Sequence, residues 1–262
     1  MSIQPIFETP IGKLPVSVYR TNEEMGRAAA EEAVTIIGQA IAEKGTANAI
    51  FATGNSQLTF LAALRERPEI EWSKVNVFHM DEYVGIDPQH PASFPNFLQR
   101  HLLDYVKPRA FYPVRAPAED TEAACREYEA LLRAHPADLC VMGIGENGHI
   151  AFNDPPFADF DDPLWVKVVR LDERSRLQQV GEGHFASLEE VPTHAVTLTI
   201  PALLAARRIL CIVPEGRKAE AVQRALRGPI TEECPASILR HTAHAHLLLD
   251  RDSAAKAFRP LE

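Results

Sequence analysis

Three side chains that could take part in acid–base chemistry lie within eight residues of one another in the middle of the chain. Asn147, His149 and Asp154 supply an amide, an imidazole and a carboxylate, after an apolar segment of strand length and a glycine-rich turn. Glycine lets the backbone approach a ligand closely. We therefore predict a ligand site at this turn. A tight turn whose polar side chains bond only to nearby backbone would show the same pattern.

The glycines of this turn also satisfy the dinucleotide-binding pattern G-x-G-x-x-G, at Gly143, Gly145 and Gly148. That motif needs a helix to begin at the third glycine. Asn153 and Pro155 follow too soon to let such a helix run. We therefore expect a turn here and no nucleotide site.

A second polar segment lies between a predicted apolar strand at 47–52 and a predicted helix at 57–67. Its residues are Thr53, Gly54, Asn55 and Ser56. Free backbone N–H groups at the start of a helix can bind a phosphate. This segment is a candidate phosphate loop, and a plain strand-to-helix turn is the alternative.

A pair of carboxylates, Asp81 and Glu82, follows another apolar strand predicted over residues 75–80. Catalytic groups of α/β sheets commonly lie at the carboxyl ends of strands. We therefore treat both carboxylates as candidate site residues. A helix N-cap or a solvated loop would also use such a pair.

The one dense histidine cluster contains His241, His244 and His246. No cysteine or carboxylate with metal-ligand spacing accompanies it, so we expect a loop leading into a final strand at 245–250, and no metal site. A serine hydrolase triad is also not indicated, because the chain has no G-x-S-x-G elbow.

The rest of the chain alternates helices and strands. A capping box at Thr21 and Glu24 predicts a long helix that Gly45 ends. Further strands are predicted over 14–19, 165–171, 195–200 and 208–213, and further helices over 94–105, 119–134 and 216–227. This alternation predicts an α/β fold with a mostly parallel, doubly wound (Rossmann-like) sheet and helices on both faces. No repeat or linker is visible, so we predict a single domain over residues 1–262.

The composition is that of a globular protein, with 46% hydrophobic and 24% charged residues among 262. A net charge of −9 and a pI near 5.6 argue against nucleic acid or an anionic membrane as partner. Four scattered cysteines without a C-x-x-C pair favour reduced, buried thiols. No apolar run of membrane-spanning length and no secretory signal is visible, so we expect a cytoplasmic protein. The sequence leaves a homo-oligomer open.

Four motifs occur in a fixed order along the chain. They are Thr53-Gly54-Asn55-Ser56, Phe78-His79-Met80-Asp81-Glu82-Tyr83-Val84-Gly85, His90-Pro91-Ala92-Ser93-Phe94, and the segment from Gly143 to Pro155. With these motifs the chain resembles the glucosamine-6-phosphate deaminase family. In the sister family, the 6-phosphogluconolactonases, an Asp-Glu-Arg usually replaces Asp81-Glu82-Tyr83, so we rank the deaminases first.

The resemblance implies conversion of glucosamine 6-phosphate to fructose 6-phosphate and ammonia, by ring opening, isomerisation and loss of the amine. Ring opening needs a group that moves a proton between the ring oxygen and the C1 hydroxyl, and a histidine suits this task. His149 is our candidate, with Asp154 orienting it. Asp81 would be the base at C2, since burial raises the pKa of a carboxyl toward working pH. None of these steps needs a cofactor or a metal.

The expected partner is a small-molecule sugar phosphate, whose phosphate would lie against the loop at 53–56. Lys218, in the first turn of a predicted helix, would supply positive charge to it. A solvated surface lysine is the alternative for this residue. We also expect Glu82, Gly145 and Gly148 to contact the substrate.

Three departures from the family pattern affect the site. Asn147 stands where the family commonly has an aspartate, and Asp154 where it commonly has a glutamate. Both weaken the electrostatic support for a protonated His149. Gly181 falls near the place of an arginine that clamps the phosphate, so the clamp is missing unless Arg176 reaches in. Two alternatives therefore remain: a lactonase in which His149 activates water, and a sugar-phosphate sensor without turnover.

Overall fold

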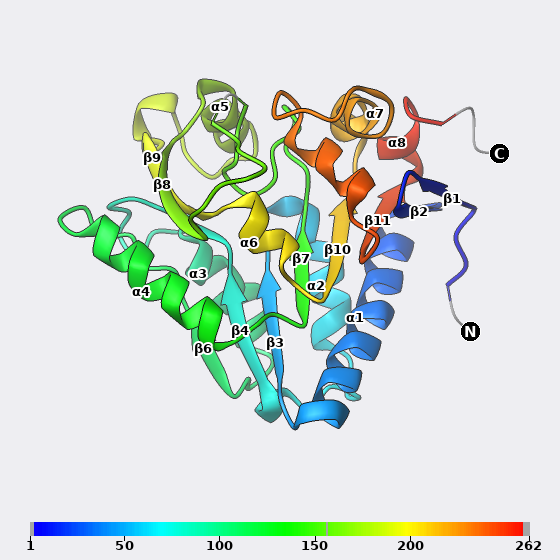
Figure 1. Ribbon diagram of the computed structural model, residues 1–262, viewed down its shortest axis with the longest axis horizontal. Coiled ribbons are helices and arrows are strands. Elements are labelled where there is room, and N and C mark those ends of the chain that lie inside the picture. The colour runs from blue at the N-terminus through cyan, green and yellow to red at the C-terminus, as the bar shows by residue number, and fades with distance from the viewer. Residues whose placement is uncertain (1–2, 156, 259–262) are drawn as a thin grey trace.

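An eight-stranded sheet forms the centre of the computed structural model, which describes residues 3–155 and 157–258 (Figure 1). The strand order is β1-β2-β11-β10-β7-β3-β4-β6, and all neighbours are parallel except β1 and β2. The strands are β1 (Phe7–Ile11), β2 (Leu14–Tyr19), β3 (Ala47–Phe51), β4 (Val75–His79), β6 (Ala110–Tyr112), β7 (Leu139–Met142), β10 (Arg208–Val213) and β11 (Ala245–Asp250). The predicted mostly parallel α/β sheet is confirmed. The ends of the domain predicted over 1–262 lie outside the described residues.

Helices cover both faces of this sheet because successive strand residues point to opposite sides. In β3, Ala49 and Phe51 belong to the core beneath α1 and α2, whereas Ile50 belongs to the core beneath α4, α6 and α7. The α-helices are α1 (Asn22–Lys44), α2 (Leu58–Arg65), α3 (Phe94–Leu98), α4 (Thr121–Ala134), α5 (Glu173–Gly181), α6 (Ile200–Leu204), α7 (Ala219–Arg227) and α8 (Arg251–Ala254). The 3₁₀ turns are η1 (Asn55–Gln57), η2 (Trp72–Lys74), η4 (Leu188–Glu190), η5 (Gly216–Lys218) and η6 (Pro235–His241), and η3 (Gln99–Leu103) is a π-helix.

The longest helix, α1, has the ends that the sequence predicts. The Thr21 hydroxyl accepts the backbone N–H of Glu24 at 3.2 Å. The Glu24 carboxylate accepts the backbone N–H of Arg20 at 3.1 Å. In a capping box it would accept the N–H of the N-cap residue, Thr21, one residue later. Gly45 ends the helix in a left-handed conformation with φ 82°. No helix in the described part of the chain is long and apolar enough to cross a membrane.

A second, antiparallel sheet of three strands, in the order β5-β9-β8, was not expected. Its strands are β5 (Asp81–Tyr83), β9 (His194–Leu198) and β8 (Val166–Arg170). The sequence pattern placed the strands near 165–171 and 195–200 in the main sheet, and this placement is wrong. In β8, Val168 is 37% exposed and Arg170 on the same face is also exposed, while Val169 on the other face is buried, which suits a sheet with one face largely open to solvent.

Neighbouring strands of the main sheet bring four chain segments together at their carboxyl ends. In the order β10-β7-β3-β4, these strands lead into η5, the glycine-rich turn, the loop at 53–56 and β5, respectively. The chain crosses from the main sheet into the small sheet at Met80, between β4 and β5. Segments far apart in the sequence thus share one edge of the fold, which is where α/β proteins bind ligands.

Candidate active site

A pocket opens at this edge. Eight of the residues predicted from the sequence line it: Thr53, Gly54, Asn55, Ser56, Asp81, Gly145, His149 and Lys218. Asn147, Asp154, Gly148 and Glu82 are not among the lining residues, and each has a different place.

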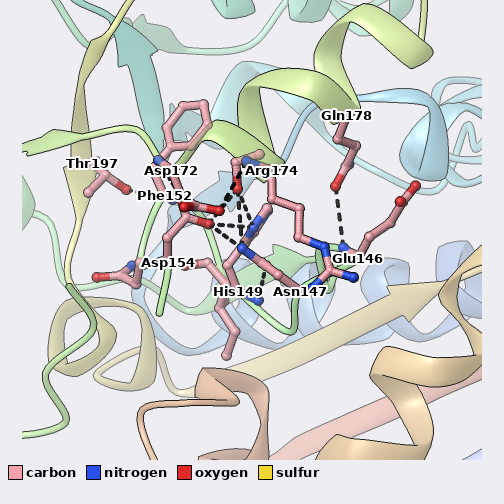
Figure 2. A network of polar contacts seen from close by, with 12 residues as sticks. Glu146, Asn147, His149, Phe152, Asp154, Asp172, Arg174, Gln178 and Thr197 are labelled. Atoms are coloured by element: carbon pink, nitrogen blue, oxygen red, sulfur yellow. Dashed lines mark hydrogen bonds and ion pairs between the residues drawn. The ribbon is translucent and has the colours of Figure 1, made fainter. Parts of the chain in front are cut away.

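Asn147 and Asp154 lie behind His149 and hold its ring (Figure 2). The Nδ1 atom of His149 lies 2.8 Å from an oxygen of Asp154, which is fully buried. The Asn147 amide donates to that same Asp154 oxygen at 2.9 Å, and its carbonyl accepts the backbone N–H of His149 at 3.0 Å. Ser175, which sequence reasoning missed, donates to Asp154 at 2.5 Å and lies 3.1 Å from the His149 ring. The Nε2 atom of His149 is left to face a ligand.

Asp154 is ionised across the working range of pH. Burial pushes the pKa of Asp154 up, but the His149 pair and the hydrogen bonds from Asn147 and Ser175 outweigh burial and bring it to about 2. A carboxylate fixed in this way orients the imidazole and stabilises the imidazolium when it forms. The amide of Asn147 therefore supports Asp154 as a donor, a task that a second carboxylate could not perform.

Gly145 and Gly148 shape the turn that carries His149. A Cβ at Gly145 would come within 2.2 Å of the His149 ring, so only glycine lets the imidazole pack against this backbone. Gly148 has φ 94°, and a Cβ there would lie 2.8 Å from the sulfur of Cys234. Gly148 therefore has a packing role, and its contact with the substrate stays a prediction. As predicted, no helix begins at this glycine.

Asp81 and Glu82 point to opposite sides of β5, because successive side chains alternate along a strand. Asp81 lines the pocket and is 7% exposed. Burial, and secondarily the charge of Glu82, raise the pKa of Asp81 to about 8. Asp81 is thus a carboxyl group whose proton affinity suits a base near neutral pH.

Glu82 lines a separate cavity with Ser93 and the loop at 113–119. Its carboxylate accepts the Ser93 hydroxyl at 2.7 Å and the backbone N–H of Tyr83 at 2.9 Å. Burial raises the pKa of Glu82 to about 7, against these hydrogen bonds. The alternation of β5 turns Glu82 away from the pocket that Asp81 lines, and its contact with the substrate stays a prediction.

The loop at 53–56 and Lys218 line another part of the pocket. Gly54 takes φ 93° and lets the loop at 53–56 turn into η1 and α2. Lys218 is 3% exposed, so the alternative of a solvated surface lysine is wrong. No described residue forms a hydrogen bond or ion pair with its ammonium. Burial lowers the pKa of Lys218, and the charge of Glu182 opposes this shift.

Helix α5 forms a wall of the pocket that the sequence did not reveal. Gln178, Gln179 and Glu182 line the pocket from this helix and its C-terminal end. Arg176 points elsewhere: it donates to the carbonyl groups of Leu188 and Val191 at 2.6 and 2.8 Å. It does not replace the missing arginine clamp. The sequence gives only a weak indication of helix α5, because the segment is polar and its apolar residues have no clear helical spacing.

In the histidine cluster, His244 and His246 contact different partners and do not form a common site. His246 lies 2.8 Å from the Ser17 hydroxyl and 2.7 Å from Glu32, and His244 lies 3.0 Å from the carbonyl of Leu204. Within residues 3–155 and 157–258, no group of three or more His, Cys, Asp or Glu residues is placed to hold a metal ion. All four cysteines are free and buried, with Cys140 in β7 and Cys211 in β10, as predicted.

A family model described as "Glucosamine-6-phosphate isomerases/6-phosphogluconolactonase" matches residues 20–248. The chain belongs to this family. One family member, named glucosamine-6-phosphate deaminase, from Bacillus cereus strain B4264, is 34% identical over 238 residues, which are 91% of this chain and 87% of the relative. A deaminase of the same name from Bacillus thuringiensis strain Al Hakam has the same identity and coverage.

Solved structures of the family have the same fold. A monomeric glucosamine-6-phosphate deaminase matches with a TM-score of 0.84 and 31% identity, over 92% of this chain and 99% of that chain. A 6-phosphogluconolactonase from Shewanella baltica OS155 matches with a TM-score of 0.73 over 92% of this chain and all of that chain. At 17% identity, the second likeness shows the fold alone.

Proposed function

We propose that this family member is a glucosamine-6-phosphate deaminase, which converts glucosamine 6-phosphate and water to fructose 6-phosphate and ammonia. The observation that carries the proposal is that Asp81 and the imidazole of His149, backed by Asp154, line one pocket. Relatives of this name at 34% identity, and a deaminase structure at 31%, support it. We further propose that the chain works in the cytoplasm as a single domain.

The substrate would bind with its phosphate against the loop at 53–56 and the ammonium of Lys218. Its C1 and ring oxygen would then face His149, and C2 would face Asp81. We choose this orientation because the phosphate is attracted to the ammonium of Lys218 and is repelled by the carboxyl group of Asp81.

Ring opening would use His149. The Nε2 atom takes the proton of the C1 hydroxyl and returns a proton to the ring oxygen, so the C1–O5 bond breaks and an aldehyde forms. The imidazolium formed in between is stabilised by the ionised Asp154, 2.8 Å away. Asn147 and Ser175 keep that carboxylate in position by their hydrogen bonds.

Isomerisation would use Asp81. Its carboxylate removes the proton from C2, the electrons of that bond form a C1=C2 double bond, and the aldehyde oxygen takes up a proton from water to give an enolamine. Protonation at C1 gives the C2 imine, and addition of water releases ammonia and leaves fructose 6-phosphate. A lactone hydrolase would need His149 to activate water but no base at C2. A sensor would need neither group, so the pairing of Asp81 with His149 favours the deaminase over both.

The proposal is tested by incubating the purified protein with glucosamine 6-phosphate and measuring both ammonia and fructose 6-phosphate. Equal amounts of both products are expected. A parallel incubation with 6-phosphogluconolactone tests the lactonase. Hydrolysis of the lactone with no product from the amino sugar would contradict the proposal. Binding of glucosamine 6-phosphate without any turnover would contradict the deaminase and favour a non-catalytic sugar-phosphate sensor.

A further inference from the structure

Glu182 places a negative charge in the same pocket as Lys218. The residue follows α5, and its side chain is 6% exposed. Its carboxylate accepts the Gln178 amide and a guanidinium nitrogen of Arg217, each at 2.8 Å. Burial pushes the pKa of Glu182 up, but hydrogen bonds from His184 and Gln178 and the charges of Arg217 and Lys218 hold it at about 2. Glu182 is therefore ionised at neutral pH.

Arg217 does not add free positive charge to this end of the pocket. Its guanidinium contacts three carboxylates, those of Glu215 at 2.5 Å, Glu182 at 2.8 Å and Glu146 at 3.2 Å. It is not among the pocket-lining residues, whereas Glu182 and Lys218 both are. The lining at this end thus presents one cation and one anion, which nearly cancel for a charged group bound between them.

We propose that Glu182 is a specificity-determining residue, whose carboxylate offsets Lys218 and weakens the binding of the substrate's phosphate. This inference rests on the proposed function for the identity of the substrate. A phosphate monoester carries close to two negative charges at pH 7 and is repelled by a fixed carboxylate. The pocket should therefore prefer a phosphorylated amino sugar over an unphosphorylated one. With Glu182 present, this preference should be smaller than Lys218 alone would give.

The test is Glu182→Gln, which keeps the size of the side chain and an oxygen that can accept from Gln178 and Arg217 while removing the charge. We expect the KM for glucosamine 6-phosphate to fall about tenfold. The change in KM should exceed the change in kcat. The KM for unphosphorylated glucosamine should respond much less, because it carries no phosphate. An unchanged or higher KM for the phosphorylated sugar would overturn the proposal.

Glu146→Gln is the matched control. It also removes a carboxylate that contacts Arg217, but Glu146 does not line the pocket. We expect a much smaller fall in KM from this variant than from Glu182→Gln, because the charge of Glu146 acts on Lys218 less strongly than that of Glu182. An equal fall in KM would mean that release of Arg217, and not loss of charge from the pocket, causes the effect, and this would also overturn the proposal.

Calorimetric titration with inorganic phosphate separates this inference from the proposed function, because it needs no turnover. We expect Glu182→Gln to bind phosphate about tenfold more tightly than the wild type. Gln179→Glu adds a charge to the same wall without altering Glu182 and should weaken phosphate binding. Equal phosphate affinities in all three proteins would contradict the role of Glu182, whatever the enzyme's reaction.

Discussion

Asn147 and Asp154 work as one unit, although each departs from the family pattern expected from the resemblance. The shorter Asp154 side chain meets the Asn147 amide at 2.9 Å and His149 at 2.8 Å on the same oxygen. An amide can donate to that oxygen and still accept the His149 N–H with its own carbonyl. The two departures therefore compensate each other, a relationship that sequence reasoning treated as two separate losses.

Asn147→Asp should accordingly reduce activity. The substitution removes the donor and brings two carboxylate oxygens close together, which raises the pKa of Asp154 and weakens its hold on the imidazole. We expect kcat at pH 7 to fall about tenfold or more. Steady-state kinetics of the variant measure this effect. A kcat equal to or above that of the wild type would show that the amide is not needed.

At the scale of elements, strand β5 determines which of the two adjacent carboxylates, Asp81 or Glu82, lies in the pocket. Its three residues leave the main sheet and pair with β9, with Asp81 opposite Thr197 and Glu82 opposite Val196. This pairing turns one carboxylate into the pocket and the other away from it. The apolar run at 75–80 predicted the strand before β5. It carried no information about the second sheet, because a three-residue strand takes its place from partners more than 100 residues away.

Glu82→Gln should move the pH profile of activity. The negative charge of Glu82 is the second cause, after burial, of the raised pKa of Asp81. Removing that charge lowers the pKa of Asp81, so the base is ionised at lower pH. We expect the rising limb of kcat/KM, near pH 8 in the wild type, to shift down by about half to one pH unit. An unmoved limb, or a shift to higher pH, would argue against Asp81 as the titrating base.

The contact of α1 with α2 gives a prediction about stability that is independent of the site. A Cβ at Gly26 of α1 would lie 2.6 Å from the Thr59 hydroxyl and 2.8 Å from the backbone nitrogen of Phe60. Gly26→Ala should therefore lower the free energy of unfolding by about 1–3 kcal/mol.

Gly38→Ala, in the same helix, is the matched control because nothing lies within 4 Å of its Cβ position. It should leave stability unchanged or raise it by about 0.5–1 kcal/mol, since alanine favours a helix over glycine. Urea unfolding of both variants measures the difference. Equal free energies of unfolding for Gly26→Ala and Gly38→Ala would contradict the close approach of α1 and α2 at Gly26.

At the scale of the whole molecule, the order of the strands brings four segments that are far apart in the sequence to one pocket. Apolar runs and caps in the sequence predicted most strands of the main sheet, the helix α1 and the segments that carry Asp81, His149 and Lys218. The sequence could not predict the pocket wall from α5, because Glu182 is held there by Arg217, 35 residues away. Long-range charge pairs of this kind leave no local pattern, whereas strand and cap signals are local.

The most direct test of the central claim follows the C2–H signal of glucosamine 6-phosphate by NMR in deuterated water, with the wild type and with Asp81→Asn. The wild type should consume this signal, because the base breaks the C2–H bond. Asp81→Asn should leave the signal intact while still binding the substrate in a calorimetric titration. Loss of the C2–H signal at the wild-type rate in Asp81→Asn would contradict the assignment of Asp81. A wild type that binds the sugar phosphate but never consumes the signal would contradict the deaminase itself.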